Sequence, residues 1–206
     1  MSGRGLFVSF EGGEGSGKST QTARLQGRLE SMDRKSLLIR EPGGTPLGEA
    51  LRELLLHRRA AISAEAELLL FLAARAELVR SVLQPALEAG TVVVCDRFSD
   101  STLAYQGYGR GLDIESIRTL DRWATGGLAP DLTVLLDLPV EVGLKRKDGD
   151  DDAFAREDGG FHARVRDGYL ALAAAEPSRW HRLDATLPEA EIEARVWAAV
   201  EPKIQA

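Results

Sequence analysis

The 206-residue sequence contains no asparagine and only one cysteine. Without asparagine, the chain has no Asn-X-Ser/Thr glycosylation site. It also cannot contain the N-K-x-D motif with which Ras-like GTPases read their base. A lone Cys95 cannot form an internal disulfide, which agrees with a reducing compartment. Because Cys95 lies in the apolar run TVVVCDR, it is expected to be a buried structural thiol.

Long hydrophobic runs and an excess of basic charge are also missing. No apolar run approaches the ~18 residues of a membrane span. The first residues lead directly into GLFVSFEGG, without the basic region, apolar core and cleavage site of a signal peptide. A net charge of −6 disfavours nucleic-acid binding, although a small nucleotide remains possible. We therefore expect a cytoplasmic protein that binds neither membrane nor nucleic acid.

Short apolar runs alternate along the chain with longer segments of helical periodicity. Strands are expected at 6–10, 36–40, 91–96, 132–137 and, more weakly, 180–183. Helices are expected from Lys18 to near residue 32 and over 64–88, and Pro139 and Pro188 suit first-turn helix positions. This alternation predicts one α/β domain over residues 1–206, with a five-stranded parallel sheet flanked by helices. Ligands bind such sheets beyond the carboxyl ends of the strands.

The segment GGEGSGKS between Gly12 and Ser19 matches the P-loop signature G-x4-G-K-S/T. A strand is expected before it and a helix after it, as this motif requires, so we expect a three-layer P-loop NTPase fold. The glycines let backbone N–H groups converge on phosphate oxygens, and the helix N-terminus adds positive charge. Lys18 should reach the outer phosphates, and the hydroxyl of Ser19 should ligate Mg²⁺. The motif identifies the donor, a nucleoside triphosphate with magnesium, and leaves the acceptor open.

Three further stretches bear on the acceptor. At the end of VVVCDRF, the carboxylate of Asp96 can hold magnesium through water, and Arg97 can clamp a second phosphate; a plain salt bridge is the alternative. The stretch LIREPGGTPLG ends another strand in a turn rich in Gly and Pro. In LLLFLAARAELV, Phe71 and Arg75 are four residues apart and share a helical face. Phe71 could stack on a base while Arg75 bonds its edge, although Phe71 taken alone is a core candidate.

From about Leu6 to Leu183 the chain closely resembles the bacterial thymidylate kinases. The resemblance is carried by FEGGEGSGKSTQ, REPGGTPLGEALRELLL, FLAARAELV, DRFSDSTLAYQGYGRGL, PDLTVLLDLPVEVGLKR and RVRDGYLALA. The P-loop is shared by a vast superfamily, whereas E-P-G-G-T and D-R-F followed by A-Y-Q-G in this order are specific to the family. The resemblance implies transfer of the γ-phosphoryl group of MgATP to dTMP, for dTTP synthesis. Relatives are homodimers, so a homodimer is expected.

Site residues follow from the resemblance position by position. The acceptor dTMP would be bound by Glu11, Pro42 (in a cis peptide), Phe71, Arg75, Arg97, Thr102, Tyr105 and Gln106. The donor ATP would be bound by Gly12, Gly13, Glu14, Gly15, Ser16, Gly17, Lys18, Ser19, Thr20 and Arg146. Magnesium would be held by Ser19 and Asp96, and the catalytic set would be Lys18, Arg97, Arg156 and Glu11.

The two carboxylates of the P-loop region are expected to point in different directions. Glu11 matches the family's carboxylate at the end of the first strand, near the acceptor sugar and phosphate. The side chain of Glu14 is expected to turn to solvent or to meet the lid.

The charged, Gly-rich stretch KRKDGDDDAFAREDGG at 145–160 is expected to be either a solvated loop or a mobile lid over the phosphates. In one type of thymidylate kinase the charge-stabilising arginine occupies the P-loop, where this chain has Gly15. In the other, bacterial type it comes from the lid, where the candidates are Arg156, Arg146 and Lys147. The acidic run 148–152 replaces expected basic residues, and its side chains are expected to point outward or to restrain the open lid.

Two other functions compatible with this pattern are a kinase for another nucleoside monophosphate and a non-catalytic P-loop switch. The first would prefer an acceptor other than dTMP. The second would bind ATP without transferring its phosphoryl group, and it would not need the separate acceptor motifs.

Overall fold

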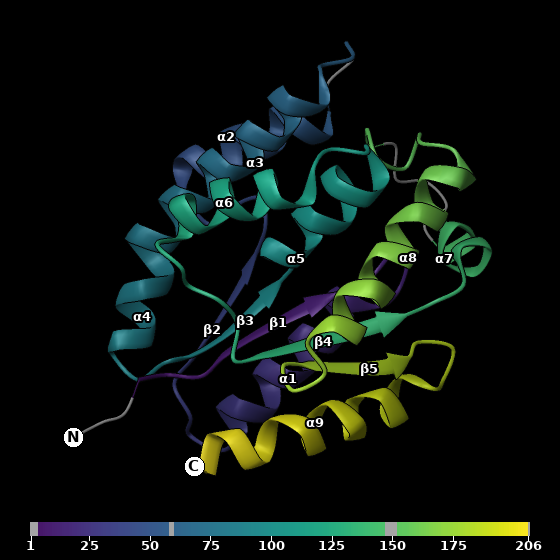
Figure 1. Cartoon of the computed structure of the whole chain (residues 1–206). Helices are drawn as coiled ribbons and strands as arrows, with labels where there is room; N and C mark the ends of the chain where they lie inside the picture. Colours follow the sequence, from purple (N-terminus) through teal and green to yellow (C-terminus); the bar gives the residue numbers. More distant parts are fainter. Residues whose placement is uncertain (1–3, 58–59, 147–151, 206) are drawn as a thin grey trace.

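Five parallel strands form one sheet in the order β2-β3-β1-β4-β5 (Figure 1). The computed structural model describes residues 4–57, 60–146 and 152–205. The strands are β1 (Phe7–Glu11), β2 (Ser36–Arg40), β3 (Val92–Asp96), β4 (Leu132–Asp137) and β5 (Trp180–Asp184). All neighbouring pairs in the sheet are parallel. This confirms the expected α/β fold, with each strand within one residue of its predicted bounds.

The helices in the described ranges are α1 (Lys18–Ser31), α2 (Pro46–Leu56), α3 (Ala64–Leu78), α4 (Gln84–Glu88), α5 (Ser99–Thr102), α6 (Ile114–Thr125), α7 (Val140–Arg146), α8 (Gly159–Ala175) and α9 (Glu189–Gln205). Two π-helical segments, η1 (Val79–Leu83) and η2 (Leu103–Gly109), continue α3 and α5. Pro139 and Pro188 directly precede α7 and α9, as expected from the fixed φ of proline.

Alternate side chains of each strand point to opposite faces of the sheet, and both faces are buried by hydrophobic cores. Val8 and Val94 belong to a core completed by residues of α1 and α9. Phe7 and Val93 belong to a second core with residues of α3, η1 and α4. A third cluster joins α3, η2, α6 and α8 to Leu135 of β4. Helices therefore cover both faces of the sheet, which gives the three expected layers.

The helical stretch predicted over 64–88 is continuous but changes its hydrogen-bonding pattern at η1. Pro85 has no N–H to donate to the carbonyl of Ser81, so the regular α-helical ladder cannot pass through this turn. The wider π turn is a common way to absorb such an interruption. Periodicity alone did not predict it.

The carboxyl ends of the parallel strands meet at one edge of the sheet, where the loops after β1 and β3 lie side by side. Across the described ranges, none of the helices is long and apolar enough to span a membrane.

Candidate functional site

The loop after β1 is shaped by glycines at positions that a side chain could not occupy. Gly12 has a φ of 145°, and a Cβ there would lie 2.5 Å from the carbonyl oxygen of Leu136. Gly15 has a φ of 64°, and its Cβ would collide with the backbone of Gly143 in α7. α7 is therefore packed directly on the P-loop. This packing gives a physical reason for glycine, rather than arginine, at position 15.

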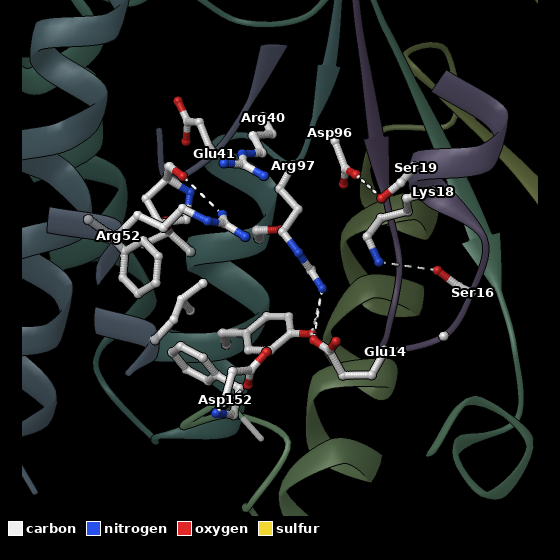
Figure 2. A pocket seen from close by; sticks show the side chains of 18 of the residues that line it. Glu14, Ser16, Lys18, Ser19, Arg40, Glu41, Arg52, Asp96, Arg97 and Asp152 are labelled. Atoms are coloured by element: carbon white, nitrogen blue, oxygen red, sulfur yellow. Dashed lines mark hydrogen bonds and ion pairs between the residues drawn. The ribbon is translucent and has the colours of Figure 1, made fainter. Parts of the chain in front are cut away.

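Lys18 and Ser19 open α1 directly behind this loop. The Nζ of Lys18 donates to the carbonyl oxygens of Gly12 and Gly13, at 3.1 and 2.8 Å. Burial and the nearby charge of Arg97 lower the pKa of Lys18 to about 8. Ser19 Oγ donates to Asp96 Oδ2 at 2.8 Å, so the end of β3 meets the start of α1 (Figure 2).

Arg97 is the centre of a polar network between the P-loop and the acceptor side. Its backbone φ is 70°, a left-handed conformation that costs free energy in a residue other than glycine. One guanidinium nitrogen donates to Gly12 O, Ser101 Oγ and Tyr169 OH, and the other donates to Glu14 Oε1 and Tyr105 OH. Figure 2 shows this guanidinium pointing toward Glu14 across the cavity. Arg97 therefore links the P-loop to α5, η2 and α8.

The two P-loop carboxylates differ in their access to the cavity. Glu14 lines the cavity, where it accepts from Arg97 at 2.9 Å and from Tyr105 OH at 2.7 Å. Glu11 is fully buried and lies outside the cavity lining. Its oxygens accept from the N–H of Phe98 at 2.8 Å and from Ser101 Oγ at 2.6 Å. The expectation of a solvent-facing Glu14 was wrong, because an arginine beside the loop attracts its charge.

Glu11 holds the start of α5 rather than an open binding surface. Burial, followed by repulsion from Asp100, raises the pKa of Glu11 to about 7. Tyr169 OH donates to Glu11 at 3.0 Å and accepts from Arg97. In this structure Glu11 therefore acts through Ser101 and Tyr169, which in turn position Arg97.

A cavity of about 420 Å³ joins the P-loop to the surfaces of α3 and η2. Its lining includes Phe71, Thr102, Tyr105 and Gln106, and the Glu41–Pro42 peptide beside it is cis as expected. This part combines aromatic rings with hydrogen-bonding groups, as a site for a nucleobase requires.

Arg75 also lines this cavity, but it is held tightly by the protein. Its guanidinium donates to Glu41 at 2.7 Å, to Asp121 at 2.8 Å, to Thr102 at 2.9 Å and to the carbonyl oxygen of Phe98. Burial opposes its charge, but Glu41 and Asp121 outweigh burial and raise its pKa. Asp121 was not among the predicted residues. A base would have to share donors that already have protein acceptors.

The structure adds a further cation on the acceptor side, Arg52 of α2. Arg40 and Arg52 both line the cavity, and Arg52 donates to the carbonyl oxygen of Pro42 at 3.0 Å. Burial and the charges of Arg40 and Arg97 lower the pKa of Arg52, a sign of clustered cations. The sequence could have indicated Arg52 by its position, because it shares a helix face with the buried Gly48 and Leu55.

The far end of the predicted lid packs on the acceptor side. Phe154 lines the cavity, with its ring 6.0 Å from Phe71 and 5.6 Å from Tyr105. Asp152 is buried rather than turned outward, and its Oδ1 accepts from the N–H groups of Phe154 and Ala155. The alternative expectation, that it restrains the open lid, stays a prediction. No motif indicated these roles, which depend on tertiary packing.

The predicted lid cations are placed differently from one another. Arg146 lines the cavity and donates to the carbonyl oxygen of Ala185 at 3.2 Å. Arg156 is exposed and does not line the cavity. Lys147 and the acidic residues 148–151 lie outside the described residues.

Most of the predicted site residues meet around this one cavity. The cavity lining includes Glu14, Gly15, Ser16, Gly17, Lys18, Ser19, Thr20, Pro42, Phe71, Arg75, Asp96, Arg97, Thr102, Tyr105, Gln106 and Arg146. The exceptions are Glu11, Gly12, Gly13 and Arg156.

Comparison with known proteins shows matches over nearly the whole chain. The family model described as "Thymidylate kinase" matches residues 10–196. A thymidylate kinase of Synechococcus sp. (strain JA-2-3B'a(2-13)) is 57% identical over 199 residues, covering 97% of this chain and 96% of the relative. One from Deinococcus radiodurans is 53% identical over 199 residues, with 96% and 97% coverage. One from Thermomicrobium roseum is 54% identical over 197 residues, with 94% and 93% coverage.

Proposed function

The chain belongs to the thymidylate kinase family, and we propose that its cavity transfers the γ-phosphoryl group of ATP to dTMP. The products are ADP and dTDP, so the enzyme acts in nucleotide biosynthesis toward dTTP. One observation carries the proposal: Lys18 of the P-loop and Arg97 of the acceptor motif line the same cavity. Two anions held by these cations would lie close enough for direct transfer.

On the donor side, the P-loop binds the triphosphate through its backbone N–H groups and Lys18. Lys18 is positioned to neutralise charge on the outer phosphate oxygens, and the N-terminus of α1 adds to the positive field. Arg146, beside Ala185, would contact the adenine side of ATP.

On the acceptor side, Arg97 and Arg52 would hold the phosphate of dTMP while Phe71 stacks on thymine. Tyr105 lies against both Glu14 and Arg97, so its ring would occupy space beside the sugar. The attacking oxygen already carries charge at neutral pH, so no strong general base is required. Positioning and charge neutralisation are the main contributions of this chain.

The residues at the ends of β3 and the P-loop fit a magnesium ion. Ser19 and Asp96 bring a hydroxyl and a carboxylate oxygen within 2.8 Å of each other in the cavity wall. Magnesium prefers oxygen ligands and is bound by one or two protein groups plus phosphates and water. In the part of the chain that the structure describes, no cluster of three or more His, Cys, Asp or Glu side chains forms an all-protein cage. The ion, when bound, would screen charge between the phosphates.

We further propose that residues 1–206 act as one kinase domain, with a lid at about 145–160 that brings Arg156 to the phosphates when it closes. Arg156→Ala is then expected to lower kcat by more than about tenfold with dTMP and ATP. Steady-state kinetics would measure this loss. Arg195→Ala, an exposed arginine of α9 that pairs with Glu191, serves as the control and should leave kcat unchanged. A smaller loss for Arg156→Ala would refute the assignment.

The proposed reaction is tested with a panel of acceptors. Purified protein with MgATP is offered dTMP, dUMP, dCMP and dGMP separately, and the ADP and diphosphate formed are measured. ADP formation with dTMP as the preferred acceptor is expected. Faster turnover of another monophosphate would indicate an altered specificity on the same scaffold. ATP binding without ADP formation from any acceptor would favour a non-catalytic switch.

We also propose a homodimer that forms through α3 and α6, which pack against each other on one side of the molecule (Figure 1). These helices expose Leu69, Leu120 and Trp123, the last with 85% of its surface accessible. Trp123→Glu is expected to give a monomer at micromolar concentration, as seen by sedimentation or light scattering. Met32→Glu, an exposed site at the end of α1, should leave the dimer intact. A monomeric wild-type protein would contradict the proposal.

A cytoplasmic location is proposed as well. Its support is the chemistry of Cys95, a buried free thiol of the kind found in reducing compartments.

A further inference from the structure

Next to Gln106 in the cavity wall lie two charged residues, Glu67 and Arg110, to which the proposed reaction assigns no role. Gln106 lines the cavity and is 1% exposed, and its Nε2 donates to Glu67 Oε1 at 2.9 Å. Glu67 of α3 is equally buried and lies outside the cavity lining. Arg110, which follows η2, donates to both oxygens of the same carboxylate, with Nε 3.1 Å from Oε1 and Nη2 3.2 Å from Oε2.

The chemistry of this network determines which way the amide of Gln106 faces. An ionised carboxylate can only accept hydrogen bonds, so the side of the amide next to Glu67 must be the NH₂ group. Arg110 keeps the carboxylate charged, since it is always protonated and binds both oxygens. It is itself anchored by Glu157 at 2.6 Å and lies over the ring of Phe161. Burial opposes the charge of Arg110, but its bonds to Glu67 and Glu157 raise its pKa.

The remaining polar atom of the Gln106 side chain is its carbonyl oxygen. Among the described residues, no side chain or backbone group donates a hydrogen bond to this oxygen. Gln106 therefore presents the carbonyl oxygen of its amide as a hydrogen-bond acceptor for a molecule in the cavity.

We propose that Glu67 and Arg110 are specificity-determining positioning residues, which lock the Gln106 amide so that the site selects a pyrimidine with an N–H at ring position 3. The proposal rests on the proposed function for the location of the base. Thymine offers this N–H, whereas cytosine has a lone pair there and would face the oxygen of Gln106 without a hydrogen bond. A buried acceptor left without its donor costs more binding free energy than a small mismatch in shape. Such a site therefore discriminates strongly against a ligand that lacks the donor.

The test compares dTMP with 5-methyl-dCMP, which keeps the methyl group, sugar and phosphate but changes the pairing edge. Dissociation constants are measured by calorimetry alongside kcat and KM. In the wild type, dTMP is expected to bind roughly a hundredfold or more tightly than 5-methyl-dCMP. Glu67→Gln replaces a group that can only accept hydrogen bonds, so the amide of Gln106 can turn. The ratio of the dissociation constants for 5-methyl-dCMP and dTMP should then fall by at least about tenfold. The change should appear in the dissociation constants and KM rather than in kcat.

Arg110→Met provides a second route to the same result if Glu67→Gln folds poorly. This variant removes the two bonds with which Arg110 holds the Glu67 carboxylate, so the carboxylate no longer fixes the amide of Gln106. Asp100→Asn is the matched control, because Asp100 is likewise buried and gripped by two nitrogens of Arg179. The Asp100→Asn variant tests for general destabilisation, and it should leave the ratio of the two dissociation constants unchanged.

If the ratio in folded Glu67→Gln and Arg110→Met stays within about threefold of the wild type, the proposal is wrong. It is also wrong if Asp100→Asn narrows the ratio as much as they do. The binding measurement separates this failure from that of the proposed function. Wild-type protein that discriminates between the two nucleotides but forms no ADP would overturn the reaction and leave the orientation of Gln106 supported.

Discussion

Lys18→Met is expected to reduce kcat/KM for ATP by about a thousandfold or more. The substitution keeps the length and apolar stem of the side chain, so the packing behind the P-loop is preserved. It removes the charge proposed to neutralise the triphosphate, and no other lysine lines the cavity within the described residues. Steady-state kinetics with varied ATP would measure the effect. Lys35→Met, at an exposed lysine just before β2, is the control and should behave as the wild type. A loss below about tenfold would contradict the role of Lys18.

The same residue should set an upper pH limit in the wild type. Burial and Arg97 lower the pKa of Lys18 to about 8, so the free enzyme loses this charge as the pH rises through that value. Because kcat/KM reports groups of the free enzyme, kcat/KM for ATP should fall above pH 8. A bound triphosphate favours the charged amine, so kcat should hold to higher pH. A kcat/KM that stays flat up to pH 10 would show that Lys18 remains charged in the free enzyme.

The sequence was sufficient to predict the fold because strand and helix signals agreed along the chain. The runs at 36–40 and 132–137 are strands with the predicted bounds. A short apolar run bounded by polar or turn residues is typical of a buried strand. The turns that change the helical register were not predictable in this way. η1 depends on Pro85, and η2 is inserted where Tyr105 and Gln106 face the cavity.

Site residues were predictable where a motif fixes the backbone geometry. The directions of side chains that have several possible hydrogen-bond partners were not predictable. Lys18, Ser19 and Asp96 lie together because the P-loop and the end of β3 are adjacent in the sheet. The direction of Glu14 was predicted wrongly because sequence position does not reveal that Arg97 lies within reach of its carboxylate. Arg52 and Phe154 join the cavity from segments far along the chain from the P-loop, so only the tertiary structure identifies them.

Arg97→Met is expected to lower kcat/KM for dTMP by about a thousandfold, with Arg97→Lys intermediate at about a hundredfold. Arg97 is the only residue here that contacts the P-loop carbonyl of Gly12 and both tyrosines, Tyr105 and Tyr169, within the described structure. Methionine keeps the volume but removes every one of these donors. Lysine restores the charge without the planar fork, so the difference between the two variants separates charge from geometry. Kinetics with varied dTMP at saturating ATP would measure both losses.

Substitution of Arg97 should weaken the use of dTMP without weakening the binding of ATP. This difference distinguishes a role in binding the acceptor from a structural role in the P-loop. Removing the guanidinium leaves Glu14 without its 2.9 Å ion pair, and a general collapse of the P-loop would then weaken ATP binding as well. The double variant Glu14→Gln/Arg97→Met removes both charges of this ion pair. If Arg97 acts on the acceptor phosphate, the double variant should bind ATP within about threefold of the wild type yet stay about a hundredfold or more below it in kcat/KM for dTMP. Recovery of dTMP turnover in the double variant would instead show that Arg97 serves to neutralise Glu14, and that another cation of the cavity, such as Arg52, holds the phosphate.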